Sequence, residues 1–156
     1  MSAHERTDEE DASVGILLID DRGWILLQLR DGRGTYPYHW ATVGGAVEPG
    51  ETIEAALWRE VYEETGYSVS HPVDFGSSGT IVLPGGRRRF VTLFVARYDG
   101  SQPIRCHEGL RITFVDPSTL DALEIYPGQR ELILEALAAS KKVTPDQLAT
   151  RPRDSG

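Results

Sequence analysis

The sequence has little that would fix a fold through covalent cross-links or a membrane. Cys106 is the only cysteine among 156 residues, so an intramolecular disulfide is excluded and a reducing compartment is the simpler expectation. No apolar run approaches the roughly 18 residues needed to span a bilayer. The polar, acidic start, MSAHERTDEEDAS, lacks the apolar core of a signal peptide. These absences predict a cytoplasmic protein without a membrane partner.

Excess positive charge is missing as well. Lysine and arginine number 16 against 24 aspartate and glutamate residues, which gives a formal net charge of −8 at pH 7. Non-specific binding of nucleic acid needs a basic surface, so a nucleic-acid polymer is not expected as a partner. A small phosphorylated ligand stays compatible with this charge, because a bound metal ion can reverse the local field.

The remaining composition suits one folded domain. Hydrophobic residues make up 40% of the chain and charged residues 26%, as in ordinary soluble domains, and the length is that of a single hydrophobic core. We see no internal repeat and no second domain. The prediction is therefore a disordered acidic N-terminus at 1–11, one domain at 12–140 and a C-terminal tail at 141–156.

Apolar runs separated by turn residues predict an α/β fold in which a mixed sheet lies between helices. SVGILLID (13–20), the turn DRG and WILLQLR (24–30) are typical of a hairpin whose strands are covered on both faces. The other expected elements are strands at 39–45, near 72–84, at 90–98 and at 109–115, helices at 53–65 and 128–140, and a short helical turn after Pro117.

The helix expected between the N-cap Thr52 and Gly66 carries an unusual set of charges. Glu60, Glu63 and Glu64 stand at spacings of three and four, where like charges oppose helix formation by roughly 0.2–0.5 kcal/mol per pair. At about 100° per residue, the apolar residues fall on another arc, which would pack on the sheet: Ala55, Leu57, Trp58, Val61 and Tyr62.

Two interpretations of the arc formed by Glu60, Glu63 and Glu64 are open. It could be a solvated charged face, as on most acidic helices. It could instead be a site for Mg²⁺ or Mn²⁺, which take carboxylates, waters and substrate phosphates together. The glycine pair at the preceding strand exit, Glu51 upstream and the Arg59–Glu63 pair favour the metal site.

The segment from Gly45 to Tyr67 resembles the MutT-type Nudix box. The residues in register with that pattern are Gly45, Glu51, Arg59, Glu60, Val61, Glu63, Glu64 and Gly66. Tyr67 departs from it, because an aliphatic residue is usual there, but this position packs rather than reacts. The wider resemblance to the Nudix hydrolase superfamily covers about residues 12–140, including the strand with Trp40 and the downstream pattern Glu108, Gly109 and Phe114.

The resemblance implies an α/β/α sandwich and hydrolysis of a nucleoside diphosphate linked to a moiety X, with Mg²⁺ (or Mn²⁺) as cofactor. A (deoxy)nucleoside triphosphate is the first expectation for the substrate. A nucleotide sugar or ADP-ribose would keep the same chemistry, and a Nudix domain that only binds a nucleotide as a sensor is a third hypothesis. Members of the family are often dimers, so a homodimer is also an expectation.

The resemblance also implies roles for single residues. Glu60 and Glu64 would be metal ligands, followed by Glu63, and the carbonyl of Gly44 or Gly45 would complete the set. Arg59 would orient the glutamates, and Glu51 would support the loop. The general base stays open between Glu108, from a later loop, and Glu63.

Other residues could contact the substrate. Arg30 ends the second strand and could face a phosphate, although an ordinary surface arginine would look the same. Tyr38 could stack on a base, whereas Trp40 is expected in the core. Arg89, at the end of the RRR run nearest the strand, is the best placed of the three for ligand contact, while a solvated edge that blocks strand pairing is the plainer interpretation of that run.

Overall fold

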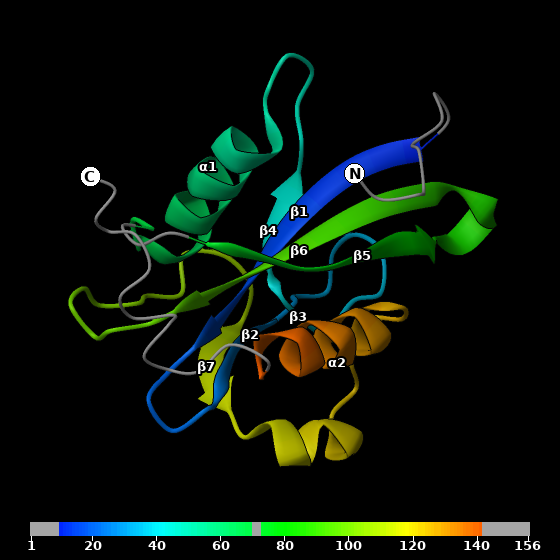
Figure 1. Ribbon diagram of the computed structural model, residues 1–156. Helices are drawn as coiled ribbons and strands as arrows, with labels where there is room; N and C mark the ends of the chain where they lie inside the picture. Colours follow the sequence, from blue (N-terminus) through cyan, green and yellow to red (C-terminus); the bar gives the residue numbers. More distant parts are fainter. Residues whose placement is uncertain (1–9, 70–72, 142–156) are drawn as a thin grey trace.

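The computed structural model describes residues 10–69 and 73–141, which form a seven-stranded mixed sheet between helices (Figure 1). This is the α/β/α sandwich that the resemblance implied. The strands are β1 (Glu10–Ile19), β2 (Ile25–Leu29), β3 (Trp40–Ala41), β4 (Val43–Ala46), β5 (Asp74–Val82), β6 (Arg88–Arg97) and β7 (Arg111–Val115). The helices are α1 (Ile53–Thr65) and α2 (Gln129–Ser140), with short 3-10 helices η1 (Pro84–Gly86) and η2 (Pro117–Ala122).

The strand order places β1 at the centre of the sheet. The hydrogen-bonded path runs β3-β2-β1-β6-β5, with β4 added to β1 and β7 to β2. β1 and β6 are parallel along their whole length, from Glu10 opposite Arg88 to Ile19 opposite Arg97. The other pairs are antiparallel.

Each face of the sheet has its own core. Leu17 of β1 belongs to the buried cluster that includes residues of α2, whereas Ile16 and Leu18 belong to the cluster that includes residues of α1. Successive side chains of a strand point to opposite faces, so a run such as GILLI can be apolar throughout only when both faces are covered. The two clusters confirm that prediction.

The expected strand at 39–45 is divided at Thr42. β3 pairs with β2 before this residue, and β4 pairs with β1 after it. Gly44 stands opposite Gly15 in the second pairing, and a Cβ atom on Gly44 would lie 2.0 Å from the Val14 carbonyl oxygen. Glycine is therefore required at position 44 for β4 to reach β1.

The ends of α1 are those that the sequence predicts. The Thr52 hydroxyl accepts a hydrogen bond from the Ala55 backbone N–H at 3.0 Å, which satisfies one of the free donors of the first turn. Gly66 has a left-handed conformation, with φ of 73°, and its N–H donates to the Tyr62 carbonyl. A residue with a side chain would be strained there.

The predicted orientation of α1 is wrong for part of its apolar arc. Trp58 and Tyr62 are 43% and 58% exposed, and Ala55 is exposed as well. The residues that face the sheet are Ala56, Leu57, Val61, Glu64 and Thr65. The helix is therefore rotated relative to the expectation from apolar periodicity, and Glu64 lies on its inner side.

The ends of the described chain refine the predicted boundaries. β1 takes in Glu10 and Asp11, which the composition had assigned to the acidic N-terminus, while 1–9 and 142–156 lie outside the described residues. Asp11 forms ion pairs with Arg87 and Arg89 beyond the η1 turn.

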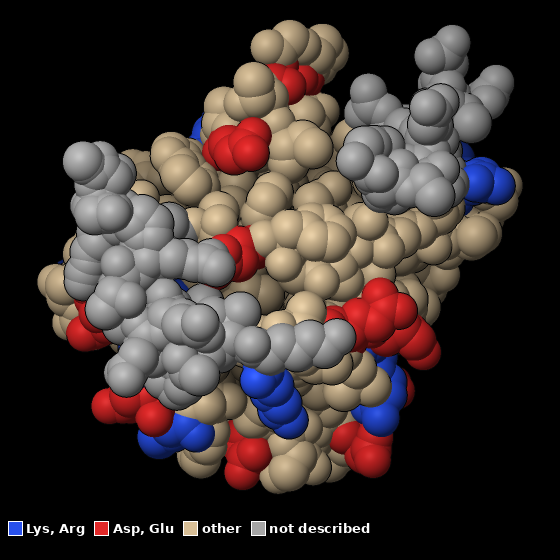
Figure 2. All heavy atoms as spheres, viewed as in Figure 1, with Lys and Arg blue, Asp and Glu red and all other residues tan. Residues whose placement is uncertain are grey.

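On the face shown in Figure 2, acidic and basic described side chains alternate along the lower rim. No helix among the described residues is long and apolar enough to cross a membrane.

Replacing Gly44 with alanine should destabilise the fold strongly. The new Cβ would meet backbone rather than a movable side chain, so we expect a loss of about 3 kcal/mol or more in the free energy of unfolding, at the upper end for overpacking. Gly50→Ala is the matched control: φ there is 83° and nothing lies within 4 Å, so only the left-handed backbone costs about 1–2 kcal/mol. Urea unfolding measures both variants, and equal losses would contradict the close approach of β4.

Candidate active site

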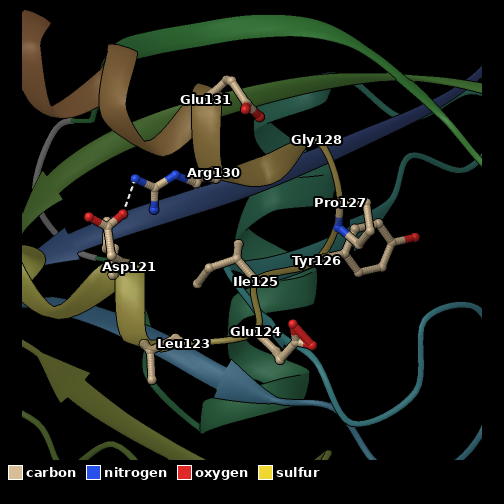
Figure 3. Close-up of a pocket in the computed structure, with 10 residues that line it drawn as sticks. Asp121, Leu123, Glu124, Ile125, Tyr126, Pro127, Gly128, Arg130 and Glu131 are labelled. Carbon is tan, nitrogen blue, oxygen red and sulfur yellow. Dashed lines mark hydrogen bonds and ion pairs between the residues drawn. The ribbon is translucent and has the colours of Figure 1, made fainter.

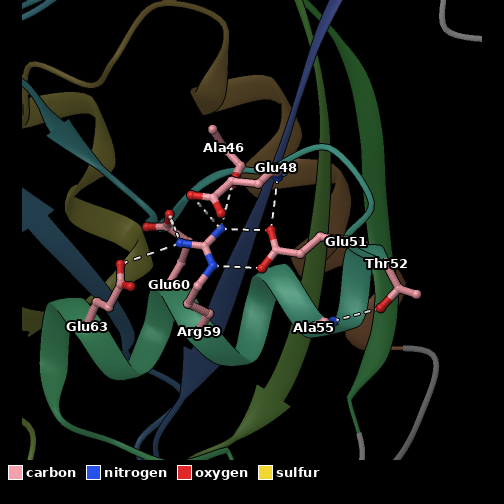
Figure 4. Close-up of polar contacts among 8 residues, drawn as sticks. All are labelled: Ala46, Glu48, Glu51, Thr52, Ala55, Arg59, Glu60 and Glu63. Carbon is pink, nitrogen blue, oxygen red and sulfur yellow. Dashed lines mark hydrogen bonds and ion pairs between the residues drawn. The ribbon is translucent and has the colours of Figure 1, made fainter.

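Arg59 of α1 is the centre of a polar cluster that closes the loop between β4 and α1 (Figure 4). Its Nε and Nη2 donate to the two carboxylate oxygens of Glu51 at 2.7 and 2.8 Å. Nη2 also donates to the Ala46 carbonyl at 3.0 Å, and Nη1 donates to Glu60 Oε2 at 2.8 Å. A bidentate guanidinium–carboxylate pair fixes direction as well as distance, so Arg59 holds Glu51 and Glu60 in place relative to β4.

Glu51 is committed to this cluster. The hydrogen bonds from Arg59 lower the pKa of the Glu51 carboxyl to about 2, and the Glu48 backbone N–H, which donates to Oε1 at 2.9 Å, acts in the same direction. The Glu51 carboxylate in turn raises the pKa of Arg59. Glu51 is therefore ionised at neutral pH with both oxygens engaged, as suits the supporting role expected for it.

Glu60 lies over a position that has no side chain. A Cβ atom on Gly45 would stand 2.3 Å from Glu60 Oε1, so glycine leaves the space that the carboxylate occupies. Burial raises the pKa of the Glu60 carboxyl, and the Arg59 hydrogen bond opposes that shift. Gly45 and Arg59 thus confine the carboxylate from two sides.

Glu64 is the most buried carboxylate in the cluster, with 5% of its surface exposed. Its Oε1 accepts a hydrogen bond from the Gly44 N–H at 3.2 Å. Burial raises the pKa of the Glu64 carboxyl to about 9, and the neighbouring Glu108 carboxyl adds to the shift. A buried carboxyl facing another acid is the arrangement that a cation would relieve.

Glu63 differs from the other two glutamates of the arc. Its side chain is 56% exposed, and its Oε1 reaches Arg59 Nη1 only at 3.5 Å. Glu60 and Glu64 are one turn apart and share a helix face, whereas Glu63 is displaced toward solvent. The structure therefore separates three residues that the sequence grouped together.

The loop after β6 brings Glu108 to the cluster. In this loop, the backbone N–H groups of Arg105 and His107 donate to the carbonyls of Thr65 and Glu64, respectively, at the C-terminal end of α1, and both distances are 2.9 Å. On the other side, the Glu108 carbonyl accepts from Gln28 Nε2 at 2.9 Å. The loop is thus tied to both α1 and β2, and Glu108 lies between them.

A cavity of about 160 Å³ lies beside these carboxylates. It opens where the sheet splits between β2 and β4. Its polar lining includes two neighbouring acids and two predicted substrate contacts: Glu64, Glu108, Arg30 and Arg89. Gly44 and Gly45 form part of the same wall. The structure therefore brings together residues from α1, β2, β4, β6 and the loop before β7.

Tyr38 is not among the residues that line this cavity. It is 63% exposed, and its ring packs over Gly32, where a Cβ atom would meet the Tyr38 hydroxyl. Trp40 is partly buried against the α2-side core, which agrees with its expected place. Tyr36 and Tyr38 both have positive φ, a strained conformation for a bulky residue.

The sequence analysis did not predict that the segment before α2 contributes to the cavity. Tyr126 and Gln129 reach the cavity from the segment that leads into α2. That segment runs beside β3, because the Trp40 N–H donates to the Glu124 carbonyl and the Tyr126 N–H donates to the Trp40 carbonyl, both at 2.8 Å. The only signal in the sequence was the position of Gln129 at the start of the expected helix 128–140.

A second, open pocket of about 430 Å³ lies between η2 and the start of α2 (Figure 3). Its lining includes an ion pair between Arg130 and Asp121. Arg130 and Glu131 face this pocket, whereas their neighbour Gln129 lines the first one. None of the residues predicted to be functional lines the second pocket.

The donor set at the first cavity fits a hard divalent cation. Within 10–69 and 73–141, no three His, Cys, Asp or Glu side chains are gathered as a ready-made metal cage. Mg²⁺ does not need such a cage, because it binds through one or two carboxylates, waters and substrate phosphates. The buried Glu64 and its neighbour Glu108, with Glu60 and the Gly44–Gly45 backbone beside them, offer such a set of oxygens.

Part of this chain is similar to curated nucleoside triphosphatases. Nucleoside triphosphatase NudI of Escherichia coli O1:K1 / APEC is 50% identical over 50 residues, which cover 32% of this chain and 36% of that protein. The match thus spans about a third of the length of the curated relatives.

Solved structures share the whole fold. The MutT protein from Methanosarcina mazei Go1 superimposes with a TM-score of 0.74 and 21% identity, over 87% of this chain and 99% of the other. The solution structure of the E. coli ORF135 protein gives a TM-score of 0.71 and 26% identity, over 94% and 96%. The family model for the NUDIX domain matches residues 9–136, which is most of the sequence, and this chain therefore belongs to the NUDIX domain family.

Proposed function

We propose that this protein is a pyrophosphohydrolase that cleaves the diphosphate linkage of nucleoside diphosphate derivatives, with a (deoxy)nucleoside triphosphate as its substrate and Mg²⁺ (or Mn²⁺) as its cofactor. The observation that carries the proposal is the cavity in which the buried Glu64 and the neighbouring Glu108 share a wall with Arg30 and Arg89. The name of the relative NudI, a nucleoside triphosphatase, supports the triphosphate. Nucleotide sugars and ADP-ribose would need the same chemistry at the phosphates.

The ion would be held by Glu60, Glu64 and Glu108, with the carbonyl of Gly44 or Gly45. NUDIX hydrolases generally use divalent metals. When bound, the ion offsets charge on the phosphate oxygens and lowers the pKa of a water molecule. The raised pKa of Glu64, caused by burial and by Glu108, supports the assignment, because a cation at this place would favour the ionised carboxylate.

Glu108 is our choice for the general base. A base must lie within hydrogen-bond reach of the water whose proton it takes, and Glu108 is among the residues that line the cavity whereas Glu63 is not. Arg59 would act indirectly, by holding the Glu60 carboxylate through its 2.8 Å hydrogen bond. Glu63 would then be a surface neighbour of Arg59 that contributes little.

Arg30 and Arg89 would bind the substrate. Guanidinium groups are permanently charged and donate to phosphate oxygens, and these two enter the cavity from the end of β2 and from β6. Their positive charge at the wall balances the acids on the α1 side. Tyr38 stays a predicted contact only for the part of a substrate that extends beyond the cavity, since it lies outside the lining.

Phosphate and pyrophosphate release from a substrate panel tests the proposal directly. The panel contains nucleoside triphosphates, nucleotide sugars, ADP-ribose and dinucleoside polyphosphates, each with Mg²⁺ and with a chelator. We expect turnover of the triphosphates that stops with the chelator, because the phosphates need the cation. Nucleotide binding without turnover of any compound would instead support a binding domain without catalysis.

Glu64→Gln should lower kcat/KM by about 100-fold or more, because the amide cannot supply the anionic oxygen. Folding should be preserved, since the neutral amide resembles the protonated acid that burial favours. Glu108→Gln should lower kcat by about 10²–10⁴-fold as a lost general base. Glu54→Gln, in the exposed first turn of α1, is the control and should keep the full rate.

Glu63→Gln separates the two candidates for the base. We expect a rate within a few-fold of the unmodified protein, because this side chain does not line the cavity. A loss as large as that in Glu108→Gln would move the base from Glu108 to Glu63. Steady-state rates on one triphosphate at saturating Mg²⁺ measure all four variants.

The stability of the metal-free protein should fall as pH rises. Glu64 has a pKa of about 9 in the folded state against an ordinary value of 4.5, so the folded protein keeps a proton that the unfolded chain releases. The contribution of this proton to the free energy of unfolding is complete below pH 4.5. It is lost as the pH rises toward 9, by up to about 1.4 kcal/mol per pH unit. Unfolding of the unmodified protein and Glu64→Gln in chelator, from pH 5 to 9, measures it. The variant should show the shallower slope; parallel profiles would contradict the raised pKa.

A further inference from the structure

Gln28 is a buried polar residue in an otherwise apolar strand. It interrupts the run ILLQL of β2 and is only 7% exposed. Side chains alternate between the two faces of a sheet, so Gln28 points to the same side as Leu26, which belongs to the cluster on the α1 side. A buried amide is unfavourable unless it forms hydrogen bonds. The partner of this amide therefore indicates why a glutamine occupies the position.

That partner is the loop that carries Glu108. Nε2 of Gln28 donates to the Glu108 backbone carbonyl at 2.9 Å. Cγ of Gln28 also lies close to Gly109, where a Cβ atom would stand 3.1 Å from it. The Cys106 thiol donates to the same carbonyl at 3.2 Å. Cys106 belongs to the loop and moves with it, whereas Gln28 belongs to the sheet and gives the loop a fixed point.

The carboxylate of Glu108 depends on its backbone for its position. Glu108 is an exposed residue, so packing restrains its side chain little. Its carboxyl group nevertheless lies beside that of Glu64 at the wall of the cavity. A shift of the Glu108 backbone would carry the carboxylate away from Glu64 and from the water that a base must reach. A misplacement of about 1 Å can lower a rate by about 100-fold.

We propose that Gln28 is a positioning residue for catalysis, which places the Glu108 carboxylate beside Glu64 through its hydrogen bond to the Glu108 carbonyl. The inference rests on the proposed function, because it takes Glu108 to act in hydrolysis. Gln28 lines the same cavity, so the test has to separate an action through Glu108 from a direct contact with the substrate.

Gln28→Met removes the donor and keeps the length of the side chain. We expect kcat for a nucleoside triphosphate to fall by about 10–100-fold. KM should change by less than about threefold, because Arg30 and Arg89 remain to bind the phosphates. An unchanged kcat with a raised KM would overturn the inference, since Gln28 would then contact the substrate. If Gln28→Met does not fold, Gln28→Asn, whose amide is one methylene shorter, should show the same loss of kcat.

Ser77→Ala is the matched control. Ser77 is 4% exposed, and its hydroxyl donates to the Leu132 carbonyl at 2.7 Å. Each of the two variants thus loses a buried side-chain donor to a backbone carbonyl, but Ser77 does not line the cavity. Ser77→Ala should keep the full kcat. Equal losses of kcat in Ser77→Ala and Gln28→Met would contradict a positioning role, because they would reflect general destabilisation.

A double-mutant cycle shows whether Gln28 acts through Glu108. In the Glu108→Gln protein, Gln28→Met should change kcat by less than about twofold, because the group that it misplaces no longer acts. A further loss as large as that in the unmodified protein would refute the inference.

Hydrogen exchange of the metal-free protein separates this inference from the proposed function. The backbone N–H groups of Arg105, His107 and Leu110 donate to carbonyls of α1 and β2. Loss of the Gln28 hydrogen bond makes local opening of the loop easier, so peptides that cover 105–110 should exchange about three- to tenfold faster in Gln28→Met, and at the unmodified rate in Ser77→Ala.

The outcomes of the exchange experiment are distinct. Exchange at the unmodified rate in Gln28→Met would overturn the positioning role, whether or not the protein hydrolyses triphosphates. Faster exchange, in a chain whose unmodified form hydrolyses no triphosphate, would overturn the proposed function and leave standing the attachment of the Glu108 loop to Gln28.

Discussion

A Cβ atom at Gly44 would stand 2.0 Å from the Val14 carbonyl oxygen, so β4 can lie beside β1 only because this position is glycine. That pairing draws the chain away from β2 and splits the sheet, which creates the cavity. It also places the Gly44 N–H against Glu64 and leaves space over Gly45 for the Glu60 carboxylate. The site is thus a consequence of two backbones that approach more closely than side chains would permit.

The charges around the cavity are segregated by the sheet. Carboxylates come from α1 and from the loop that is tied to its C-terminal end, whereas guanidinium groups come from β2 and β6. Burial makes the charge of Glu64 costly, as its raised pKa shows, and it leaves Nε of Arg30 and of Arg89 without a hydrogen-bond partner. A ligand that carries phosphates together with a divalent cation would relieve both costs.

Arg59 gives the acidic side its rigidity. Four hydrogen bonds from its guanidinium group engage Glu51 in a bidentate pair, Glu60 and the Ala46 carbonyl at the same time. The glutamates near β4 are therefore oriented before a ligand arrives, which reduces the reorganisation needed when one binds. The low pKa of Glu51 and the high pKa of Arg59 keep this cluster charged over a wide pH range.

Much of the fold followed from local patterns. Apolar runs and turn residues indicated the strands and both helices, and Thr52 and Gly66 marked the ends of α1, because capping depends on a few neighbouring residues. The spacing of the Nudix box pointed to the acidic cluster. The rotation of α1 was less accessible: Trp58 and Tyr62 were expected inside, yet it is Glu64 that faces the sheet. Apolar periodicity predicts which helix residues face the sheet, whereas the glycines of β4 leave the space beside the sheet that Glu60 and Glu64 occupy.

The sequence by itself determined the elements, the caps and the family pattern, since each of these depends on residues close together in the chain. Only the tertiary structure decided that Glu63 is exposed while Glu64 is buried, that Tyr38 lies outside the cavity, and that Gln129 lies within it. The reason is physical. Thr42 and Gln129 are 87 residues apart, and their hydrogen bond exists only because the segment before α2 runs beside β3, a pairing that no local pattern encodes.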